Sequence, residues 1–123
     1  MPTATCHCGA TRIEVDRLPE TAVLCNCTFC AKRGALWGYY DPAEVRVTVA
    51  GADAIYAPRR NKHHFCPTCG CGTYTLTPNW RAHHHEGAPM RDDAQMSVNL
   101  RLLDDADVEA LPVERIDGRT GWG

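Results

Sequence analysis

Eight cysteines in three clusters restrict what this chain of 123 residues can fold into more than any other feature. In chain order they are Cys6, Cys8, Cys25, Cys27, Cys30, Cys66, Cys69 and Cys71. Within each cluster, gaps of one or two residues separate neighbouring cysteines. Such spacing is typical of metal binding, whereas an even number of cysteines in a secreted chain would indicate a disulfide framework. The sequence therefore predicts thiolate metal sites.

The N-terminal residues and the charge balance bear on where the protein works. Residues 1–10 are polar and lack the basic stretch followed by an apolar stretch that marks a secretory signal. The formal net charge of −2 does not fit the basic footprint of a nucleic-acid-binding protein. No apolar run approaches the roughly 18–20 residues of a membrane span. We therefore expect a cytoplasmic protein with reduced thiols and with neither nucleic acid nor a membrane as partner.

Apolar and polar residues alternate over short segments, which predicts a mainly β fold with little helix. The clearest strands are Thr11–Val15 and Val45–Val49. Further strands are expected at 21–24, 35–40, 54–57, 73–76, 95–102 and 113–116. A short helix is expected at 104–111, because acidic residues stand in its first turn. Polar loops are expected at 58–64 and 78–89.

Two cysteine pairs have the spacing of zinc ligands. Cys6 and Cys8 would lie on one face of an extended segment, so both sulfurs can reach one ion. Cys66 and Cys69 form a zinc knuckle, with Gly70 directly after them. Four thiolates close one tetrahedral zinc site. Joining the two pairs would leave the remaining cluster as a separate centre.

The middle cluster offers three ligands within six residues: Cys25, Cys27 and Cys30. Catalytic zinc sites keep three protein ligands and an open position for water or substrate. The alternative is a second closed site, with the fourth ligand supplied by Cys71, His7 or His64. From spacing alone both alternatives stay open.

The segments TCHCGA, CNCTFC, FCPTCGCGTY and VERIDG together resemble the glutathione-dependent formaldehyde-activating enzyme family, over residues 3–118. The resemblance implies a small zinc-stapled, Mss4-like β fold with two Zn²⁺ per chain. The structural zinc would be held by Cys6, Cys8, Cys66 and Cys69. The catalytic zinc would be held by Cys25, Cys27 and Cys30.

The family resemblance also implies an activity. It is that of a carbon–sulfur lyase that forms or cleaves a thiol–aldehyde adduct, with glutathione-like and formaldehyde-like substrates. Residues 1–118 would form the single zinc-binding catalytic domain, and 119–123 a short C-terminal tail. The alternative function is a non-enzymatic zinc-stapled binding module. Redox chemistry of the neighbouring thiols Cys69 and Cys71 is a third hypothesis.

The remaining candidate residues have simpler interpretations. Cys71 is expected to be a packed thiol, and the histidines at 63–64 and 83–85 are expected in solvated loops, with proton transfer as the alternative. The basic run of Arg59, Arg60 and Lys62 is interpreted as a solvated face that could attract the carboxylates of a glutathione-like thiol. The aromatic residues that follow the middle cysteines are expected to pack in the core or to form a pocket wall. They are Trp37, Tyr39 and Tyr40.

Overall fold

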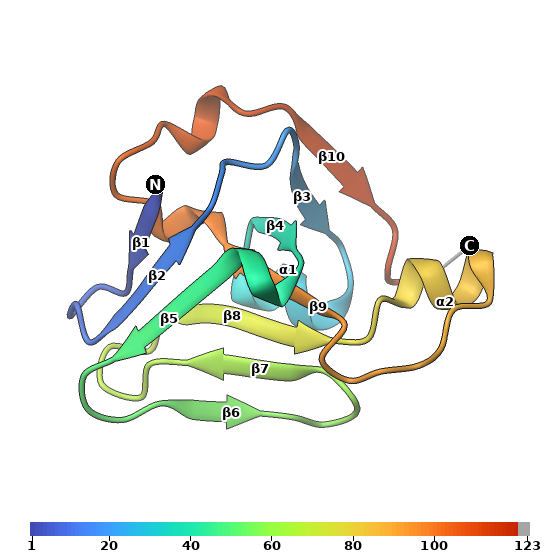
Figure 1. Ribbon diagram of the computed structural model, residues 1–123, viewed down its shortest axis with the longest axis horizontal. Helices are drawn as coiled ribbons and strands as arrows, with labels where there is room; N and C mark the ends of the chain where they lie inside the picture. The colour runs from blue at the N-terminus through green and yellow to red at the C-terminus, as the bar shows by residue number, and fades with distance from the viewer. Residues whose placement is uncertain (121–123) are drawn as a thin grey trace.

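The short strands pair into two sheets in the computed structural model, which describes residues 1–120 (Figure 1). Within these residues one sheet has three strands and the other has seven. The predicted mainly β fold with little helix is confirmed. No helix within residues 1–120 is long and apolar enough to cross a membrane.

The smaller sheet has the order β1-β2-β5 and is antiparallel throughout. Its strands are β1 (Thr3–Thr5), β2 (Thr11–Val15) and β5 (Val45–Val49). On the central strand β2, Thr11, Ile13 and Val15 are buried, whereas Arg12 is exposed and Glu14 is half-buried. This alternation turns one face of the sheet toward the core.

The larger sheet has the order β10-β3-β4-β9-β8-β7-β6. Its strands are β3 (Ala22–Cys25), β4 (Trp37–Tyr40), β6 (Ala54–Tyr56), β7 (Lys62–Phe65), β8 (Gly72–Thr77), β9 (Gln95–Asn99) and β10 (Val113–Ile116). Strand β10 runs parallel to β3, and the other neighbours are antiparallel. The end of the described chain is thereby brought beside the strand that delivers Cys25.

The main core lies between the two sheets. Its buried residues come from both of them: Ala4, Ile13, Val15, Tyr40, Val45, Tyr74, Met96 and Val98. A smaller cluster of Val23, Ala35 and Trp37 lies on the far side of β3 and β4, with Phe29 and Cys30 packed against it. This second cluster anchors the segment that carries the middle cysteines.

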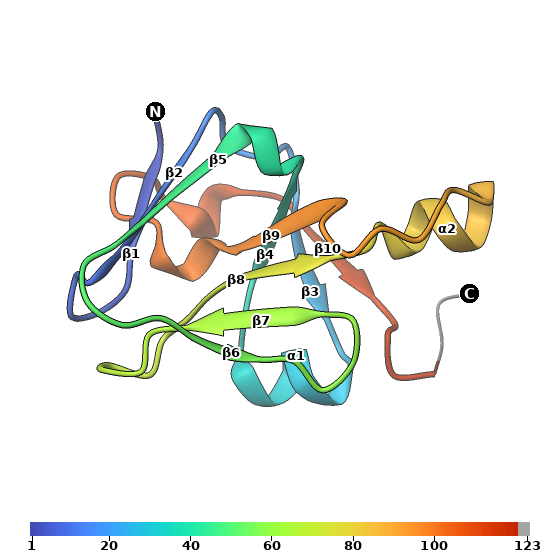
Figure 2. The same ribbon diagram turned by 60° about the horizontal axis from the view of Figure 1, so that its bottom comes forward.

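Within the described residues two α-helices connect the strands, and the sequence analysis predicted neither. Helix α1 (Thr28–Arg33) begins at Cys27, whose side chain accepts from the backbone N–H of Cys30, and ends at the left-handed Gly34. Helix α2 (Trp80–Glu86) begins after Asn79 and ends at Gly87. Figure 2 shows α2 projecting from the sheets, whereas α1 lies below the ends of the strands.

The helix expected at 104–111 is wrong. Only a 3₁₀ turn, Val108–Ala110, forms in this segment. Two further 3₁₀ turns occur elsewhere in the chain, at Pro42–Glu44 and Leu100–Leu102. The acidic side chains bond the N-terminal strand instead of a helical first turn. Asp105 accepts from the backbone N–H of Thr3 at 3.1 Å, and Asp104 accepts from the hydroxyl of Thr5 at 2.7 Å.

Both expected polar loops are also corrected. The loop expected at 58–64 ends early, because β7 begins at Lys62 and pairs with β6 and β8. The loop expected at 78–89 contains α2. The sequence signals for this helix are Asn79 as its N-cap and Gly87 at its C-terminal end. They do not distinguish it from a loop, because the residues between them are mostly polar.

Candidate metal centres and active-site pocket

The first and third cysteine clusters meet at one edge of the molecule. Cys6 and Cys8 lie in the turn between β1 and β2, and Cys66 and Cys69 lie in the turn between β7 and β8. Their four sulfurs lie within 4.8 Å of one another. The Sγ atoms of Cys6 and Cys8 are 3.7 Å apart, and those of Cys8 and Cys66 are 3.6 Å apart.

The two turns have the same glycine conformation and the same backbone hydrogen bond. Gly9 and Gly70 each follow the second cysteine of a pair, and each has φ of +83°. Each donates its backbone N–H to the carbonyl of the first cysteine, at 3.0 Å to Cys6 and 2.8 Å to Cys66. A residue with a side chain is strained at such φ values, so glycine is the favoured residue for this tight turn.

The distances within this four-sulfur cluster fit zinc. A tetrahedral site with Zn–S bonds of about 2.3 Å places sulfurs about 3.8 Å apart. The sulfur separations of 3.6 and 3.7 Å are close to that value. The N–H of Thr11 also donates to Sγ of Cys6 at 3.3 Å, as expected for a thiolate ligand. The cluster therefore has the composition and size of a closed tetrathiolate site.

The middle cluster is assembled by the junction of β3 and α1. Cys25 ends β3, Cys27 caps α1 and Cys30 lies in its first turn. Their three sulfurs also lie within 4.8 Å of one another. The backbone N–H of Cys27 donates to Sγ of Cys25 at 3.5 Å, and that of Cys30 donates to Sγ of Cys27 at 3.3 Å. Within residues 1–120, neither group of sulfurs includes Cys71.

Two further segments hold this cysteine triplet. The indole Nε1 of Trp37 on β4 donates to Sγ of Cys30 at 3.3 Å. From beyond β10, Arg119 donates its backbone N–H to the side-chain oxygen of Asn26 and its Nε to the Asn26 carbonyl, both at 3.0 Å. A Cβ on Gly118 would lie only 2.8 Å from Sγ of Cys25. The chain end thus closes tightly over the loop that carries the triplet.

Burial and donated N–H groups act in opposite directions on these thiols. Burial raises the pKa of the Cys30 thiol well above its usual range, although the Trp37 N–H opposes this. Burial also works against ionisation of Cys27, but hydrogen bonds from the Cys30 N–H, from the thiols of Cys30 and Cys25 and from the Phe29 N–H outweigh it and lower the Cys27 pKa. A metal cation would displace the remaining protons, because thiolates are its ligands.

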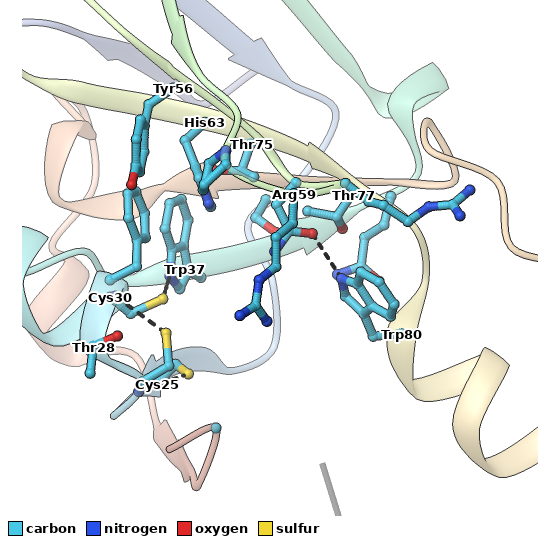
Figure 3. Close-up of a pocket in the computed structure, with 18 of the residues that line it drawn as sticks. Cys25, Thr28, Cys30, Trp37, Tyr56, Arg59, His63, Thr75, Thr77 and Trp80 are labelled. Atoms are coloured by element: carbon cyan, nitrogen blue, oxygen red, sulfur yellow. Dashed lines mark hydrogen bonds between the residues drawn. The ribbon is translucent and has the colours of Figure 1, made fainter. Parts of the chain in front are cut away.

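An open pocket of about 710 Å³ lies over the triplet (Figure 3). All three cysteines of the triplet line it, whereas no cysteine of the four-sulfur cluster does. The sheet forms its other wall. Alternation along β8 and β9 turns Tyr74 and Val98 toward the core, while Thr75 and Ser97 line the pocket.

Aromatic rings form one side of the pocket. Phe29 of α1 stacks on His63 of β7 with ring centroids 3.7 Å apart, and Tyr56 of β6 stacks beside both at about 6 Å. On another side, the Nε1 of Trp80 donates to the side-chain oxygen of Asn61 at 2.8 Å. These rings form apolar surface on the sheet side of the pocket.

The charges of the pocket differ from those of the whole chain. Among the described lining residues are Arg59, Arg60 and Arg119, and no aspartate or glutamate. Arg60 forms an ion pair of 2.8 Å with Asp92, which does not line the pocket. In Figure 3 the side chain of Arg59 points toward the pocket interior on the side of Cys25. The pocket is therefore suited to a ligand that carries negative charge.

The expectation of a solvated loop for His63 and His64 is wrong, because both lie buried on β7. Strand alternation turns them to opposite faces. Nδ1 of His63 lies 3.0 Å from Oγ1 of Thr75 at the pocket, while Nδ1 of His64 lies 2.6 Å from a carboxylate oxygen of Asp53. His64 stacks on Tyr74 at 4.1 Å, which directs it away from the triplet.

The remaining residues proposed from the sequence lie in different parts of the structure. Tyr39 and Trp37 line the pocket, whereas Tyr40 packs in the core between the sheets. The histidines at 83–85 lie in the last turns of α2 rather than in a loop, and His84 lines the pocket. His7 is exposed in the turn of the four-sulfur cluster.

Several pocket residues were not candidates from sequence. Thr75 and Arg119 lie outside the motif segments, and strand pairing brings them to the triplet. Phe29 lies within CNCTFC and Gly118 within VERIDG, but neither carries a metal-binding or titratable side chain that would mark it as a pocket residue. A weak signal existed for Thr75, because polar residues alternate with apolar ones along 73–76. For Arg119 no local signal existed, since its contacts are with Asn26, 93 positions away.

Comparison with known proteins identifies the family. The family model of the glutathione-dependent formaldehyde-activating enzyme matches residues 1–107. The crystal structure of a Rhodobacter sphaeroides protein matches 91% of this chain and 99% of its own, with 29% sequence identity and a TM-score of 0.67. The family predicted from the cysteine motifs is confirmed, while β10, Gly118 and Arg119 lie beyond the matched residues. The chain belongs to the glutathione-dependent formaldehyde-activating enzyme family.

Proposed function

We propose that the protein is a zinc-dependent carbon–sulfur lyase that forms or cleaves a thiol–aldehyde adduct. One observation carries the proposal: three cysteine sulfurs converge on the wall of an open pocket of about 710 Å³. Three protein ligands beside an accessible space are the arrangement of a catalytic zinc site. Membership of the family supports the same reaction class.

The two groups of cysteines have different roles in this proposal. Cys6, Cys8, Cys66 and Cys69 hold a structural zinc, because four sulfurs complete its coordination away from the pocket. Cys25, Cys27 and Cys30 hold the catalytic zinc. Each chain would therefore bind two Zn²⁺.

The reaction makes or breaks one carbon–sulfur bond. In formation, the thiolate sulfur bonds to the carbonyl carbon, the π electron pair moves to oxygen, and that oxygen takes up a proton. Cleavage reverses each change. Zinc, when bound, supplies a cation that lowers the pKa of the substrate thiol. Phe29 and Tyr56 place apolar surface beside the triplet, against which the carbon atoms of a substrate can pack.

The pocket charges support a carboxylate-bearing thiol as substrate. Guanidinium groups bind carboxylates through paired charge-assisted hydrogen bonds. Arg59 and Arg119 line the same pocket as the triplet, so a thiol of glutathione type has cationic partners within it. A small aldehyde such as formaldehyde is the second substrate in this proposal.

Two measurements test the proposed function. Metal analysis should give about two zinc ions per chain, and about one in Cys27→Ser. Exchange NMR on mixed glutathione and formaldehyde should show adduct turnover faster than the spontaneous rate with the wild type but not with Cys27→Ser. Cys71→Ser is the matched control, since Cys71 belongs to neither group, and should keep the acceleration. A wild type that binds two zinc ions without accelerating exchange would reject the lyase and favour the binding module.

A further inference from the structure

His63 places an imidazole on the pocket side of β7, across from the cysteine triplet (Figure 3). Two contacts fix the ring. Nδ1 lies 3.0 Å from Oγ1 of Thr75 on β8, and the ring face stacks on Phe29 at 3.7 Å between centroids. Because Phe29 immediately precedes Cys30 on α1, the stack fixes the imidazole relative to the helix that carries the triplet.

The other ring nitrogen of His63 faces the pocket. Within residues 1–120 no hydrogen bond engages Nε2, and the one fully buried side-chain nitrogen or oxygen without a partner is Oγ1 of Thr11. Nε2 is therefore accessible rather than sealed in the protein. In Figure 3 the ring points from β7 into the pocket, on the side where Cys30 and Trp37 lie.

The surroundings of His63 keep it uncharged yet able to exchange a proton. Burial, followed by the charges of Arg33 on α1 and His64 on β7, lowers its pKa to about 4. Tyr56 of β6 and Thr75 of β8 also contact the ring, and no aspartate or glutamate is among the described residues that line the pocket. The hydroxyl of Thr75 both donates and accepts, so it can pair with Nδ1 in either neutral tautomer and in the imidazolium.

We propose that His63 is a catalytic acid–base residue of the lyase, with Nε2 exchanging a proton with the substrate oxygen, and that Thr75 is its positioning residue. The proposal rests on the proposed function. In cleavage, the adduct hydroxyl gives its proton to Nε2. The electron pair of the broken O–H bond forms the carbonyl π bond, and the electron pair of the broken carbon–sulfur bond leaves with the sulfur as thiolate. In formation, the imidazolium returns that proton to oxygen.

The test compares three variants with wild-type protein, using equilibrated glutathione and formaldehyde as the probe. His63→Gln should lower kcat for adduct turnover by about 100-fold with KM changed less than about threefold, because general acid–base groups contribute about 10²–10⁴-fold. Thr75→Val should lower kcat by about three- to tenfold through loss of ring orientation. His64→Asn, on the opposite face of the same strand, should leave kcat unchanged. Zinc content should stay at the wild-type value in all three.

A second readout does not depend on turnover. In ¹⁵N-histidine-labelled wild type, saturating adduct should shift the Nε2 resonance of His63 and leave that of His64 in place. If the wild type accelerates exchange and His63→Gln does so equally, the acid–base proposal is wrong while the lyase stands. If His63→Gln loses zinc or does not fold, the other two measurements decide. Unchanged turnover in Thr75→Val together with an unshifted Nε2 resonance of His63 would then overturn the acid–base proposal. A wild type without acceleration rejects the lyase itself before any variant is made.

Discussion

The indole Nε1 of Trp37 donates a hydrogen bond of 3.3 Å to Sγ of Cys30. Trp37 is buried in the cluster formed by Val23 and Ala35, so the packed core fixes the direction of this N–H. An N–H directed at a thiolate disperses part of its charge and holds it in place for a metal. The contact links a core side chain to Cys30, a proposed ligand of the catalytic zinc.

Replacing Trp37 by Phe should weaken zinc binding at the triplet. The ring would still fill much of the cluster, but the N–H to sulfur is lost, and outer-shell partners of metal ligands contribute about 10–100-fold to affinity. We expect zinc affinity at the triplet to fall by about tenfold, and affinity for the other ion to be unchanged. Chelator competition with stepwise zinc release measures it.

Trp80→Phe is the matched control for this prediction. Its indole also lines the pocket, but its N–H donates to Asn61 rather than to sulfur. Zinc affinity should be unchanged in this variant. An equal loss in Trp80→Phe and Trp37→Phe would assign the effect to pocket shape and not to the hydrogen bond.

Gly118→Ala should remove zinc from the triplet while leaving the sheets folded. The added Cβ would lie 2.8 Å from Sγ of Cys25 and 3.2 Å from Cβ of Cys27, which displaces these ligands. We expect about one zinc ion per chain in place of about two, with thermal unfolding close to wild type. Metal analysis and circular dichroism together measure both quantities.

Gly38→Ala gives the contrasting control. A Cβ there would lie 2.9 Å from Cδ2 of Leu100, in the core rather than at the cysteines. Overpacking costs about 1–3 kcal/mol of folding free energy, so Tm should fall while zinc content stays at about two. Retention of both ions by Gly118→Ala would contradict the tight closure of the chain end on the triplet.

The two cysteine groups should differ in their effect on stability. Cys69→Ser opens the cluster that ties the β1–β2 turn to the β7–β8 turn, and a structural zinc contributes on the order of 10 kcal/mol to folding. We expect Cys69→Ser to disrupt the fold, and Cys27→Ser to lose one zinc but stay folded. Equal loss of circular dichroism in the two variants would argue against separate structural and catalytic roles.

The parts of this site that sequence could predict are those fixed by local chemistry. Cysteine gaps of one and two residues predict two groups of possible metal ligands, and in the structure the sulfurs of each group lie within 4.8 Å of one another. The alternation of β2 and β5 sets the buried faces of these strands. The expected strands at 73–76 and 113–116 correspond to β8 and β10. In each case the signal lies within a few neighbouring residues.

The parts that could not be predicted depend on pairing between distant segments. His63 and His64 look alike in sequence, and only the register of β7 against β8 directs one to Thr75 and the other to the face of Tyr74. Helix α1 is six residues long and starts at a cysteine cap, which no helix rule favours. Arg119 approaches the triplet through the parallel pairing of β10 with β3.

The burial of His63 should make stability depend on pH in a defined direction. His63 is 7% exposed and its pKa is lowered to about 4, against about 6.5 in an unfolded chain. As pH falls below about 6.5 the unfolded state takes up a proton first, so stability is lost until the pH reaches about 4. From about pH 7 to about pH 5 this amounts to roughly 2 kcal/mol. Urea unfolding of zinc-loaded protein should show a loss that is larger by this amount in wild type and His64→Asn than in His63→Gln, because proton competition for the zinc-binding thiolates is common to all three. Parallel pH curves for wild type and His63→Gln would mean that His63 titrates normally in the folded protein.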